Sequence, residues 1–378
     1  MGVVRFDRIA RECRETHKGG FDGIPIVGLE HIEPYEMRLK NYDINVETTF
    51  TKRFHEGQIL FGRRRAYQHK ACVATCDGIC SGDITVIEPI EGQVYPGLLP
   101  FIIQNDDFFE HAIKGSNGAL SPRVKWEHMA NFEVNLPSFA EQKLLAEKLW
   151  AAYEVKQSYL KMIKATQEMV QSQFIEMFGD PMTNPKGWPV MTMKESSTLL
   201  SDGPFGSNLK TEHYCETGIR VIRLQNICLG YFDDTDKAFI SEQHYEKLRK
   251  YTCRPGEIVI GTLGEPNFRA CVIPNYIQVS INKADCVHYI PKEDLLDCTF
   301  ACAYINCERT LQMATSNIHG TTRARIAAGQ VNNIPIYIPP LDMQKRFVTM
   351  VQQSDKSEFE LRKSIDAIDA VIKSLINS

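Results

Sequence analysis

The residues with the clearest chemical potential are basic and amide side chains on short turns between apolar segments. Three consecutive arginines, Arg63, Arg64 and Arg65, follow the glycine that closes one apolar run, and Gln68 and Lys70 come shortly after them. Guanidinium and side-chain amide groups offer paired hydrogen-bonding atoms that suit base edges in the major groove of DNA. A charge run of this kind is also typical of a solvated surface turn, which is the alternative interpretation.

A second group of candidates has the same residue types in comparable places. They lie in a glycine-containing loop, on or after apolar strands, or before the last strand of each half of the chain: Asn208, Lys210, Arg220, Arg223, Gln225, Asn226, Arg269, Arg123, Lys125, Arg323 and Arg325. The last four suit phosphates at least as well as bases, and phosphate contacts supply affinity without sequence information. Each candidate could instead form a structural salt bridge.

Motifs for catalysis are missing. The chain has no Walker-type phosphate loop, no glycine fingerprint of dinucleotide binders, no Asn-Pro-Pro-aromatic segment of an amino-methyltransferase and no Pro-Asp dipeptide of the usual nuclease motif. We therefore expect a non-catalytic chain that binds no cofactor of its own. Its formal net charge of −4 excludes a general polycation but not local basic clusters.

The cysteines and the N-terminus bear on where the protein acts. Most of the 12 cysteines lie in apolar runs, and no Cys-x-x-Cys occurs. Cys72, Cys76 and Cys80 are four residues apart, which is a weak zinc cue, but buried reduced thiols in a reducing cytoplasm fit better. We expect a cytoplasmic protein with no metal site, because neither a secretory signal nor a membrane span is evident.

The segments that must position these side chains occur twice. GQILFG at residues 57–62 recurs as GEIVIG at residues 256–261, an offset of 199 (256 minus 57). Further on the offset is 202, which aligns Arg123 with Arg325. Several matches in constant order indicate a duplicated unit. The turn after the first glycine run does not repeat, which favours one scaffold that reads two different targets.

Each copy mixes predicted strands and helices. Short β-branched or aromatic runs predict strands at residues 24–28, 59–62, 84–87 and 132–136, and at residues 221–223, 258–261, 270–273 and 334–338. Helices are expected at residues 100–112 and 295–313. The fold class is therefore α/β or α+β, built as a two-domain repeat.

A long helix is expected after each globular segment. Ser138 and Glu141 fit a capping box at the start of the first helix. Seam positions then alternate by four and three residues from Leu149 to Met177, and again from Phe347 to Leu375. Two such seams predict an intramolecular antiparallel coiled coil. The alternative is that each helix packs on its own domain, but a helix of about 36 residues would span about 54 Å, more than one small domain needs.

These elements divide the chain into four segments. We predict a first globular domain at residues 1–137, a central helix at 138–180, a second globular domain at 181–340 and a C-terminal helix at 341–378. Gly179 followed by Pro181 is the expected stop of the first helix.

The residues also carry a family resemblance over essentially the full length. The most specific stretches are IVGLEHIE at residues 26–33, RRRAYQHKACVATCDGICSGD at 63–83, FGDPMTNPKGWP at 178–189, GPFGSNLKTEHY at 203–214 and GIRVIRLQNI at 218–227. With them, the chain resembles the specificity subunits of type I restriction-modification systems. One departure is that the first copy lacks the Gly-Trp-Pro opening of the second.

The resemblance implies a function and a set of partners. It implies a DNA-binding subunit that selects a bipartite, asymmetric site in double-stranded DNA. Two adenine methyltransferase subunits, which use S-adenosylmethionine, and restriction subunits, which use ATP and magnesium, would join it. The alternatives are the specificity partner of a fused restriction-methylation enzyme, a stand-alone nuclease or methyltransferase, and a coiled-coil scaffold for proteins alone.

Overall fold

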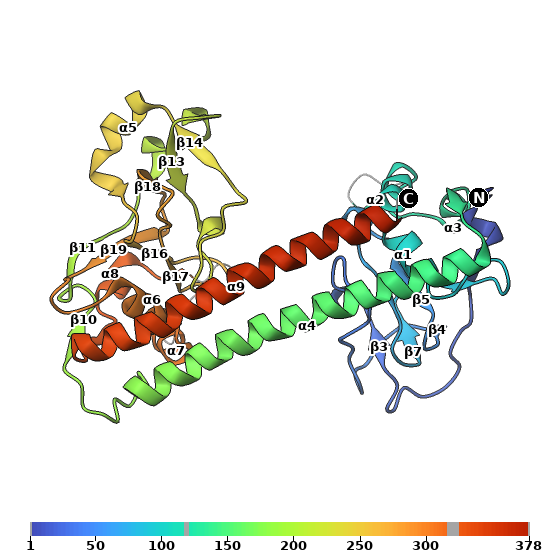
Figure 1. The fold of residues 1–378 in the computed structure, drawn as a ribbon, viewed down its shortest axis with the longest axis horizontal. Helices are drawn as coiled ribbons and strands as arrows, with labels where there is room; N and C mark the ends of the chain where they lie inside the picture. The colour runs from blue at the N-terminus through green and yellow to red at the C-terminus, as the bar shows by residue number, and fades with distance from the viewer. Residues whose placement is uncertain (1, 117–120, 316–324, 377–378) are drawn as a thin grey trace. The chain divides into compact units, whose positions relative to one another are not determined.

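The computed structural model describes residues 2–116, 121–315 and 325–376, drawn as a ribbon in Figure 1. The chain divides into two compact units. Unit 1 consists of Met1–Leu160 and Arg362–Ser378, and unit 2 consists of Lys161–Leu361. Both long helices, α4 (Phe139–Phe178) and α9 (Leu341–Ile376), contribute to both units.

Unit 1 contains two sheets and a two-stranded ribbon among its described residues. The four-stranded sheet has the order β2-β8-β5-β6, with strands β2 (Ala10–Cys13), β8 (Ile84–Pro89), β5 (Ile59–Gly62) and β6 (Ala71–Val73). The three-stranded sheet has the order β3-β7-β4, with strands β3 (Ile26–Val27), β7 (Gly78–Cys80) and β4 (Lys52–Phe54). The ribbon pairs β1 (Gly2–Arg5) with β9 (Glu133–Leu136). The shorter helices are α1 (Leu99–Gln104), α2 (Asp106–Lys114) and α3 (Trp126–Met129).

Unit 2 repeats this plan with additions. Its four-stranded sheet has the order β11-β19-β16-β17, with strands β11 (Ser197–Ser201), β19 (Cys286–Pro291), β16 (Ile258–Gly261) and β17 (Arg269–Val272). Its second sheet has the order β12-β14-β13-β18-β15, with strands β12 (Tyr214–Cys215), β14 (Ala238–Ile240), β13 (Ile219–Ile222), β18 (Ser280–Asn282) and β15 (Thr252–Cys253). The ribbon pairs β10 (Val190–Thr192) with β20 (Pro335–Tyr337). The shorter helices are α5 (Glu242–Leu248), α6 (Cys298–Asn306), α7 (Glu308–Thr315) and α8 (Ala328–Asn332).

Strand register shows that the sequence repeat is a structural repeat. In unit 1, Ile59 pairs with Val73 on one side and with Ile87 on the other. In unit 2, Ile258 pairs with Val272 and with Tyr289. These partners differ by the same offsets of 199 and 202 that the sequence gives (272 minus 73; 289 minus 87). The predicted two-domain α/β repeat is therefore confirmed.

The predicted single helices at residues 100–112 and 295–313 are wrong in one respect, because each is broken into two. Asn105 separates α1 from α2 with an extended backbone, and its side chain caps α2 by accepting from the Asp107 amide at 3.3 Å. Cys307, at an offset of 202 (307 minus 105), has the same extended backbone between α6 and α7. The apolar pattern runs through both breaks, which hid them in the sequence.

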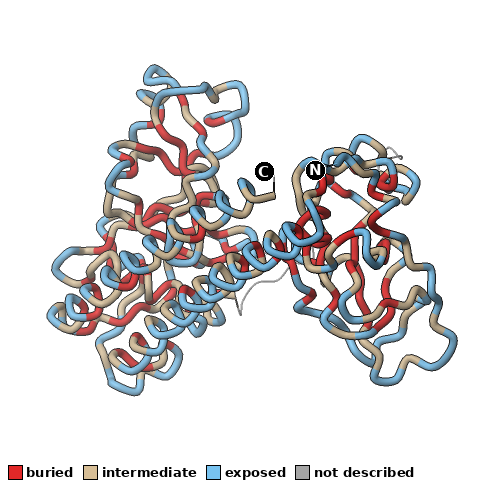
Figure 2. Tube along the Cα trace, turned by 45° about the vertical axis from the view of Figure 1, so that its right-hand side comes forward, coloured by how far each residue is buried: buried red, intermediate tan, exposed pale blue. Residues whose placement is uncertain are grey.

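Each unit has its own core, and the buried residues concentrate on its strands and inward helix faces (Figure 2). In unit 1, Leu149 and Tyr153 of α4 pack into a core that includes Phe61 and Phe108. In unit 2, Phe174 of α4 and Phe347 of α9 lie in one core, with their ring centroids 5.5 Å apart. The long helices thus pack on the globular domains as well as on each other.

The helices pair antiparallel within each unit. In unit 1, Lys156 of α4 forms an ion pair with Asp369 of α9 at 2.7 Å. In unit 2, Gln167 of α4 donates to Glu358 of α9 at 3.1 Å. Partner numbers fall along α9 as they rise along α4, so the two chain segments run in opposite directions. The predicted antiparallel pairing is confirmed.

The predicted helix ends are also present. The Glu141 carboxylate accepts from the Ser138 amide at 2.9 Å and from its hydroxyl at 2.7 Å, at the start of α4. Gly179 follows Phe178 with a φ of 84°, and its amide donates to the Ile175 carbonyl at 2.8 Å. A left-handed glycine at this place is a common helix stop, because it costs little backbone strain there.

Candidate nucleic-acid interface

In unit 1 one aspartate holds the arginine turn. The Asp83 carbonyl accepts from the Arg63 amide at 2.9 Å, at the end of β5. The Asp83 carboxylate accepts from Arg123 Nε at 2.7 Å and Nη2 at 3.3 Å. Arg64 Nη1 lies 3.5 Å from the same carboxylate, and Arg64 Nε donates to the Ser121 hydroxyl at 2.6 Å. The guanidinium group of Arg123 lowers the pKa of Asp83, so the pair stays charged.

Unit 2 builds the same frame. The Asp285 carbonyl accepts from the Thr262 amide at 3.0 Å, and Arg325 Nε lies 2.6 Å from the Asp285 carboxylate. Arg325 also lies 3.5 Å from Asp202. Asp83 and Asp285 differ by 202 (285 minus 83), as do Arg123 and Arg325. The frame is therefore a duplicated aspartate–arginine pair that ties two turns together.

The residues displayed on the frame differ between the units. An isolated bridge joins Arg64 to Arg123 in unit 1, and the matching bridge in unit 2 joins Leu263 to Arg325. Unit 1 thus has the guanidinium group of Arg64 where unit 2 has the apolar side chain of Leu263. The same backbone frame with different side chains fits two readers of two different sequences.

One group of predicted residues is exposed or half-buried on these turns and loops and lies outside the aspartate–arginine frames. Its members are Arg65, Gln68, Lys125, Asn208, Lys210 and Gln225. Arg65 has a φ of 56°, and this left-handed turn directs the backbone from β5 into the following 3-10 turn. Among the described residues, the side chains of Arg65, Gln68, Lys125 and Gln225 have no hydrogen-bond or ion-pair partner. Of these, Arg65, Lys125 and Gln225 are exposed and are therefore the best placed to meet a ligand.

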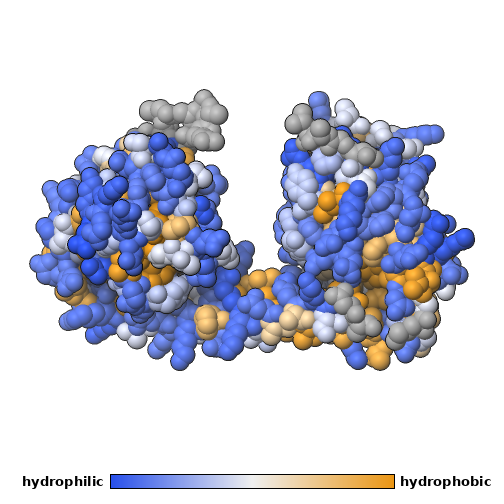
Figure 3. Space-filling model, turned by 90° about the horizontal axis from the view of Figure 1, so that it is seen from above, coloured by the Kyte–Doolittle hydropathy of each residue, from blue (hydrophilic) through white to orange (hydrophobic). Residues whose placement is uncertain are grey.

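Asn208 and Lys210 are exposed but have local contacts. Asn208 Nδ2 donates to the Phe205 carbonyl at 3.0 Å, and Lys210 lies 3.7 Å from Glu212. Both contacts involve exposed side chains, and such contacts cost little to break. Most residues on the face shown in Figure 3 are hydrophilic, with apolar patches among them.

Other predicted residues serve the protein itself. The buried Arg220 donates to Asp234 at 2.8 Å, and Arg223 Nε donates to Asp236 at 2.8 Å. The Asn226 side chain is fully buried and donates to the carbonyls of Asp233 and Asp236. These contacts hold the loop after β13, so we assign the three side chains a structural role.

Lys70 and Arg269 also hold the backbone. Lys70 Nζ donates to the Leu29 carbonyl at 2.6 Å. Arg269 donates to four backbone carbonyls, those of Ile227, Leu263, Pro266 and Leu224. A guanidinium group has five N–H donors in a fixed geometry, so this clamp uses most of its capacity. Arg323, the remaining predicted residue, lies outside the described residues.

Sequence reasoning missed Asp83 and Asp285. The offset of 202 that aligned Arg123 with Arg325 also aligns these two aspartates, so the signal was present. The two aspartates were not predicted because an acidic side chain is not expected to contact DNA. A duplicated acid at the same offset as a duplicated base indicates an ion pair kept in both copies.

The second half of the chain matches a known protein family. Residues 256–368 match the family model described as the type I restriction modification DNA specificity domain. Residues 256–368 are thus similar to a type I DNA specificity domain. This stretch runs from β16 through the Asp285–Arg325 frame into α9, so the matched domain contains the frame of unit 2. The resemblance stated from the sequence motifs is confirmed.

Curated relatives carry the same family description. The specificity subunit of the type I restriction enzyme MjaVIII from Methanocaldococcus jannaschii is 20% identical over 288 residues, which are 72% of this chain and 66% of the relative. The specificity subunit of the type I restriction enzyme EcoDI from Escherichia coli is 25% identical over 151 residues, which are 39% of this chain and 33% of the relative. The matched parts thus span under two thirds of each relative.

Solved structures share the fold. The S subunit of a type I restriction-modification system from M. genitalium has a TM-score of 0.56 at 12% identity, with 99% of this chain and 94% of that chain covered. A chain from a structure of complex assembly in a type I R-M system has a TM-score of 0.52 at 17% identity, with 100% and 96% covered. The type I specificity-subunit fold therefore extends over both units.

The remaining predictions concern metal, thiols and membranes. Within residues 2–116, 121–315 and 325–376, no group of His, Cys, Asp and Glu side chains is arranged to hold a metal ion. All 12 cysteines are free thiols, and burial raises the pKa of Cys80 to about 12. In the same part of the chain, every helix is too short or too polar to cross a lipid bilayer.

Proposed function

We propose that this chain is the DNA sequence-specificity subunit of a type I restriction-modification complex. Each unit reads one part of a bipartite, asymmetric site in double-stranded DNA. The observation that carries the proposal is the duplicated aspartate–arginine frame, because it presents different side chains from the same backbone in a fold that specificity subunits share. Arg65 in unit 1 and Gln225 in unit 2 are the leading base-reading residues.

The long helices are the proposed docking surface for partner subunits. Large apolar side chains are exposed along both of them: Leu144, Val155, Met162 and Met169 on α4, and Phe359 and Val371 on α9. Exposed apolar residues on paired helices are typical of protein interfaces. The partners would be two modification methyltransferase subunits, joined by restriction subunits.

The chemistry belongs to these partners. The modification subunits would bind S-adenosylmethionine and methylate adenine, and the restriction subunits would use ATP and magnesium. This chain would bind no cofactor and would act in the cytoplasm. Because adenine must leave the base stack before methylation, its part is to hold the duplex in register while the partner extrudes the base.

Helix length suggests how the two readings are spaced. The 40 residues of α4 extend about 60 Å, more than one turn of DNA at about 34 Å. Because α4 contributes to both units, its length would bear on the number of unread base pairs between the two parts of the site. The spacer would then follow from the helices rather than from the reading turns.

Footprinting tests the proposal directly. The chain is purified with its modification subunit and bound to a library of duplexes. The expected result is protection of one asymmetric bipartite sequence. Equal protection of all sequences would overturn the proposal, and methylation or cleavage by the chain alone would show that it is an enzyme.

A further inference from the structure

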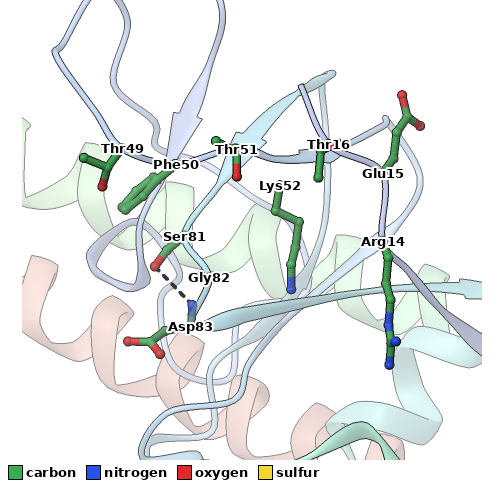
Figure 4. Close-up of a pocket in the computed structure, with 10 residues that line it drawn as sticks. All are labelled: Arg14, Glu15, Thr16, Thr49, Phe50, Thr51, Lys52, Ser81, Gly82 and Asp83. Atoms are coloured by element: carbon green, nitrogen blue, oxygen red, sulfur yellow. Dashed lines mark hydrogen bonds between the residues drawn. The ribbon is translucent and has the colours of Figure 1, made fainter. Parts of the chain in front are cut away.

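Unit 1 contains a pocket of about 530 Å³ beside the Asp83 frame (Figure 4). It forms where the segment after β2, the segment that leads into β4 and the turn between β7 and β8 meet. Its lining residues are Arg14, Glu15, Thr16, Thr49, Phe50, Thr51, Lys52, Ser81, Gly82 and Asp83. None of the predicted site residues lines it.

The half-buried Lys52 is the central cation of this pocket. Its Nζ donates to the Ile84 carbonyl at 2.6 Å, which leaves two of its three N–H donors. In the described chain, no carboxylate lies within ion-pair distance of this ammonium group. Burial lowers the pKa of Lys52; Cys80 and Glu12 offset part of this effect, and Arg63 and Arg14 add to it. An anion in the pocket would relieve the effects that lower it.

The acidic residues of the pocket are engaged elsewhere. Glu15 lies 3.5 Å from Arg53 and 3.0 Å from His55. Asp83 is held by Arg123 and by Arg64. Neither of these two acidic residues therefore pairs directly with Lys52.

Hydroxyl groups surround this charge. Thr16 and Thr51 point to the same side as Lys52, whereas the Glu15 carboxylate points the opposite way (Figure 4). Threonine hydroxyls donate readily to phosphate oxygens. One half-buried ammonium group and adjacent hydroxyls are the donor set of a phosphate site.

In unit 2 a carboxylate takes the place of Arg14 of the pocket. Cys13 pairs with Val86 in unit 1 and Ser201 pairs with His288 in unit 2, so Arg14 corresponds to Asp202. Asp202 accepts from the Asp285 amide at 3.0 Å. The next residue, Gly203, lies so close to the backbone of Lys283 that a Cβ would overlap its carbonyl. The cationic pocket is therefore a feature that unit 1 does not share with its repeat.

We propose that the Lys52 pocket of unit 1 takes one phosphate group of the DNA backbone. The inference rests on the proposed function and adds a positioning site to it. Because Asp83 borders the pocket and also holds Arg64 and Arg123, a phosphate bound there fixes the height of the adjacent turn over the groove. Arg65 then meets the bases in one register.

Salt-dependent DNA binding tests the site. Affinity of the full chain for a duplex with its mapped site and for a scrambled duplex is measured by fluorescence anisotropy at several salt concentrations. Lys52→Met should reduce the slope of log affinity against log salt by about 0.9 on both duplexes, as one lost phosphate contact requires. The affinity at about 0.1 M salt should fall about eightfold. Lys52→Arg should restore most of it.

Two variants keep this test interpretable. Lys148→Met removes the same charge from an exposed position of α4 and should leave the slope unchanged. Thr51→Val removes a pocket hydroxyl without disturbing the bond from Lys52 to Ile84, and it should weaken both duplexes several-fold. If Lys52→Met fails to fold, Thr51→Val decides the question.

Uncharged methylphosphonate groups in the DNA backbone identify the phosphate that the pocket contacts. A duplex series with single methylphosphonates should contain one position where wild type loses affinity and Lys52→Met loses no more. If millimolar inorganic phosphate displaces the DNA at constant ionic strength, the pocket is a site for free anions and the assignment is overturned. An unchanged salt slope in a folded Lys52→Met variant would also overturn it. If wild type binds both duplexes equally, the proposed function fails, and the slopes still decide the phosphate site.

Discussion

Asp83 and Asp285 organise the candidate interface at the scale of single residues. Each carboxylate forms an ion pair with an arginine that comes from a different turn, and each carbonyl closes the preceding strand. Charge-assisted bonds of this kind are about twice as strong as neutral ones, and bidentate geometry adds orientation. The pairs therefore fix the height and direction of the turns that present Arg65 and its counterparts.

Replacing Asp83 should reveal this role through pH. Arg123 lowers the pKa of Asp83 below the ordinary value of 3.8, so the stabilisation is present above that value and is lost as pH falls through the lowered pKa. Asp83→Asn should lower the free energy of unfolding by about 1 kcal/mol at neutral pH, since Arg123 is partly exposed. Urea titrations should show the difference begin to shrink near pH 3.8 and vanish once the pH is below the lowered pKa. A difference that persists unchanged in acid would contradict the ion-pair account.

The two units predict a reciprocal pair of variants. Arg65→Ala should relax selection in one part of the DNA site only, and Gln225→Ala in the other part only. Each lost base contact should cost about 1–3 kcal/mol of discrimination. Competition binding with duplexes mutated in either part measures both effects. Uniform weakening on every sequence by either variant would mean that its side chain contacts phosphate instead.

Residue type alone could locate the reading turns but could not sort the residues on them. Arg220 and Arg65 look equivalent in the sequence, yet Arg220 is buried against Asp234, which lies 14 residues away. Sorting them requires knowing which carboxylates the sheet brings near each arginine. Lys52 was missed for the converse reason, because a lone lysine at a strand start gives no signal until its neighbours are known.

At the scale of elements, a buried glutamine ties each long helix to its domain. Gln142 of α4 accepts from the Tyr95 amide at 2.8 Å and donates to the Pro137 carbonyl at 3.0 Å. Gln344 of α9, 202 residues later (344 minus 142), accepts from the Asp297 amide at 2.9 Å and donates to the carbonyls of Leu295 and Pro339. The sequence repeat aligned these glutamines, but their role needed the structure.

Gln344→Ala should loosen the attachment of α9 to unit 2. It leaves one amide and two carbonyls buried without their partner, which should cost about 3 kcal/mol. Gln353→Ala on an exposed position of α9 is the matched control and should stay within about 0.5 kcal/mol of wild type. Chemical denaturation of both variants provides the comparison. Equal small effects would show that the glutamine bonds do not stabilise the joint.

The helix pairing predicts a charge-reversal rescue. Lys156→Asp places two acids together on α4 and α9 in unit 1, and Asp369→Lys alone places two lysines together. Each single variant should lose about 1 kcal/mol of stability, and the double variant should recover most of it. Thermal unfolding of the four proteins measures the coupling. Additive losses in the double variant would argue against the antiparallel register.

Heptad spacing made the pairing predictable, whereas the broken helices were not. Seam residues such as Ile163 and Ile365 are buried, as the alternation of four and three requires. The breaks at Asn105 and Cys307 depend on backbone angles that no apolar pattern records. Because both copies break at matching positions, the broken helix (α1–α2 in unit 1 and α6–α7 in unit 2) is a property of the repeat.

For the molecule as a whole, the central claim is that one scaffold built twice reads two different sequences. The repeat was visible in the sequence because glycine-bounded strands and closing prolines kept their spacing. The identity of the recognised bases could not be predicted from the sequence, because it depends on how deeply each turn enters a groove of the DNA.

Genome-wide mapping of methylated adenine in cells that carry the chain and its modification subunit tests this claim most directly. The account predicts one bipartite, asymmetric motif that disappears when the gene is deleted. It further predicts that Arg65→Ala and Gln225→Ala each relax a different part of that motif. A continuous motif, or a methylation pattern that survives deletion of the chain, would contradict it.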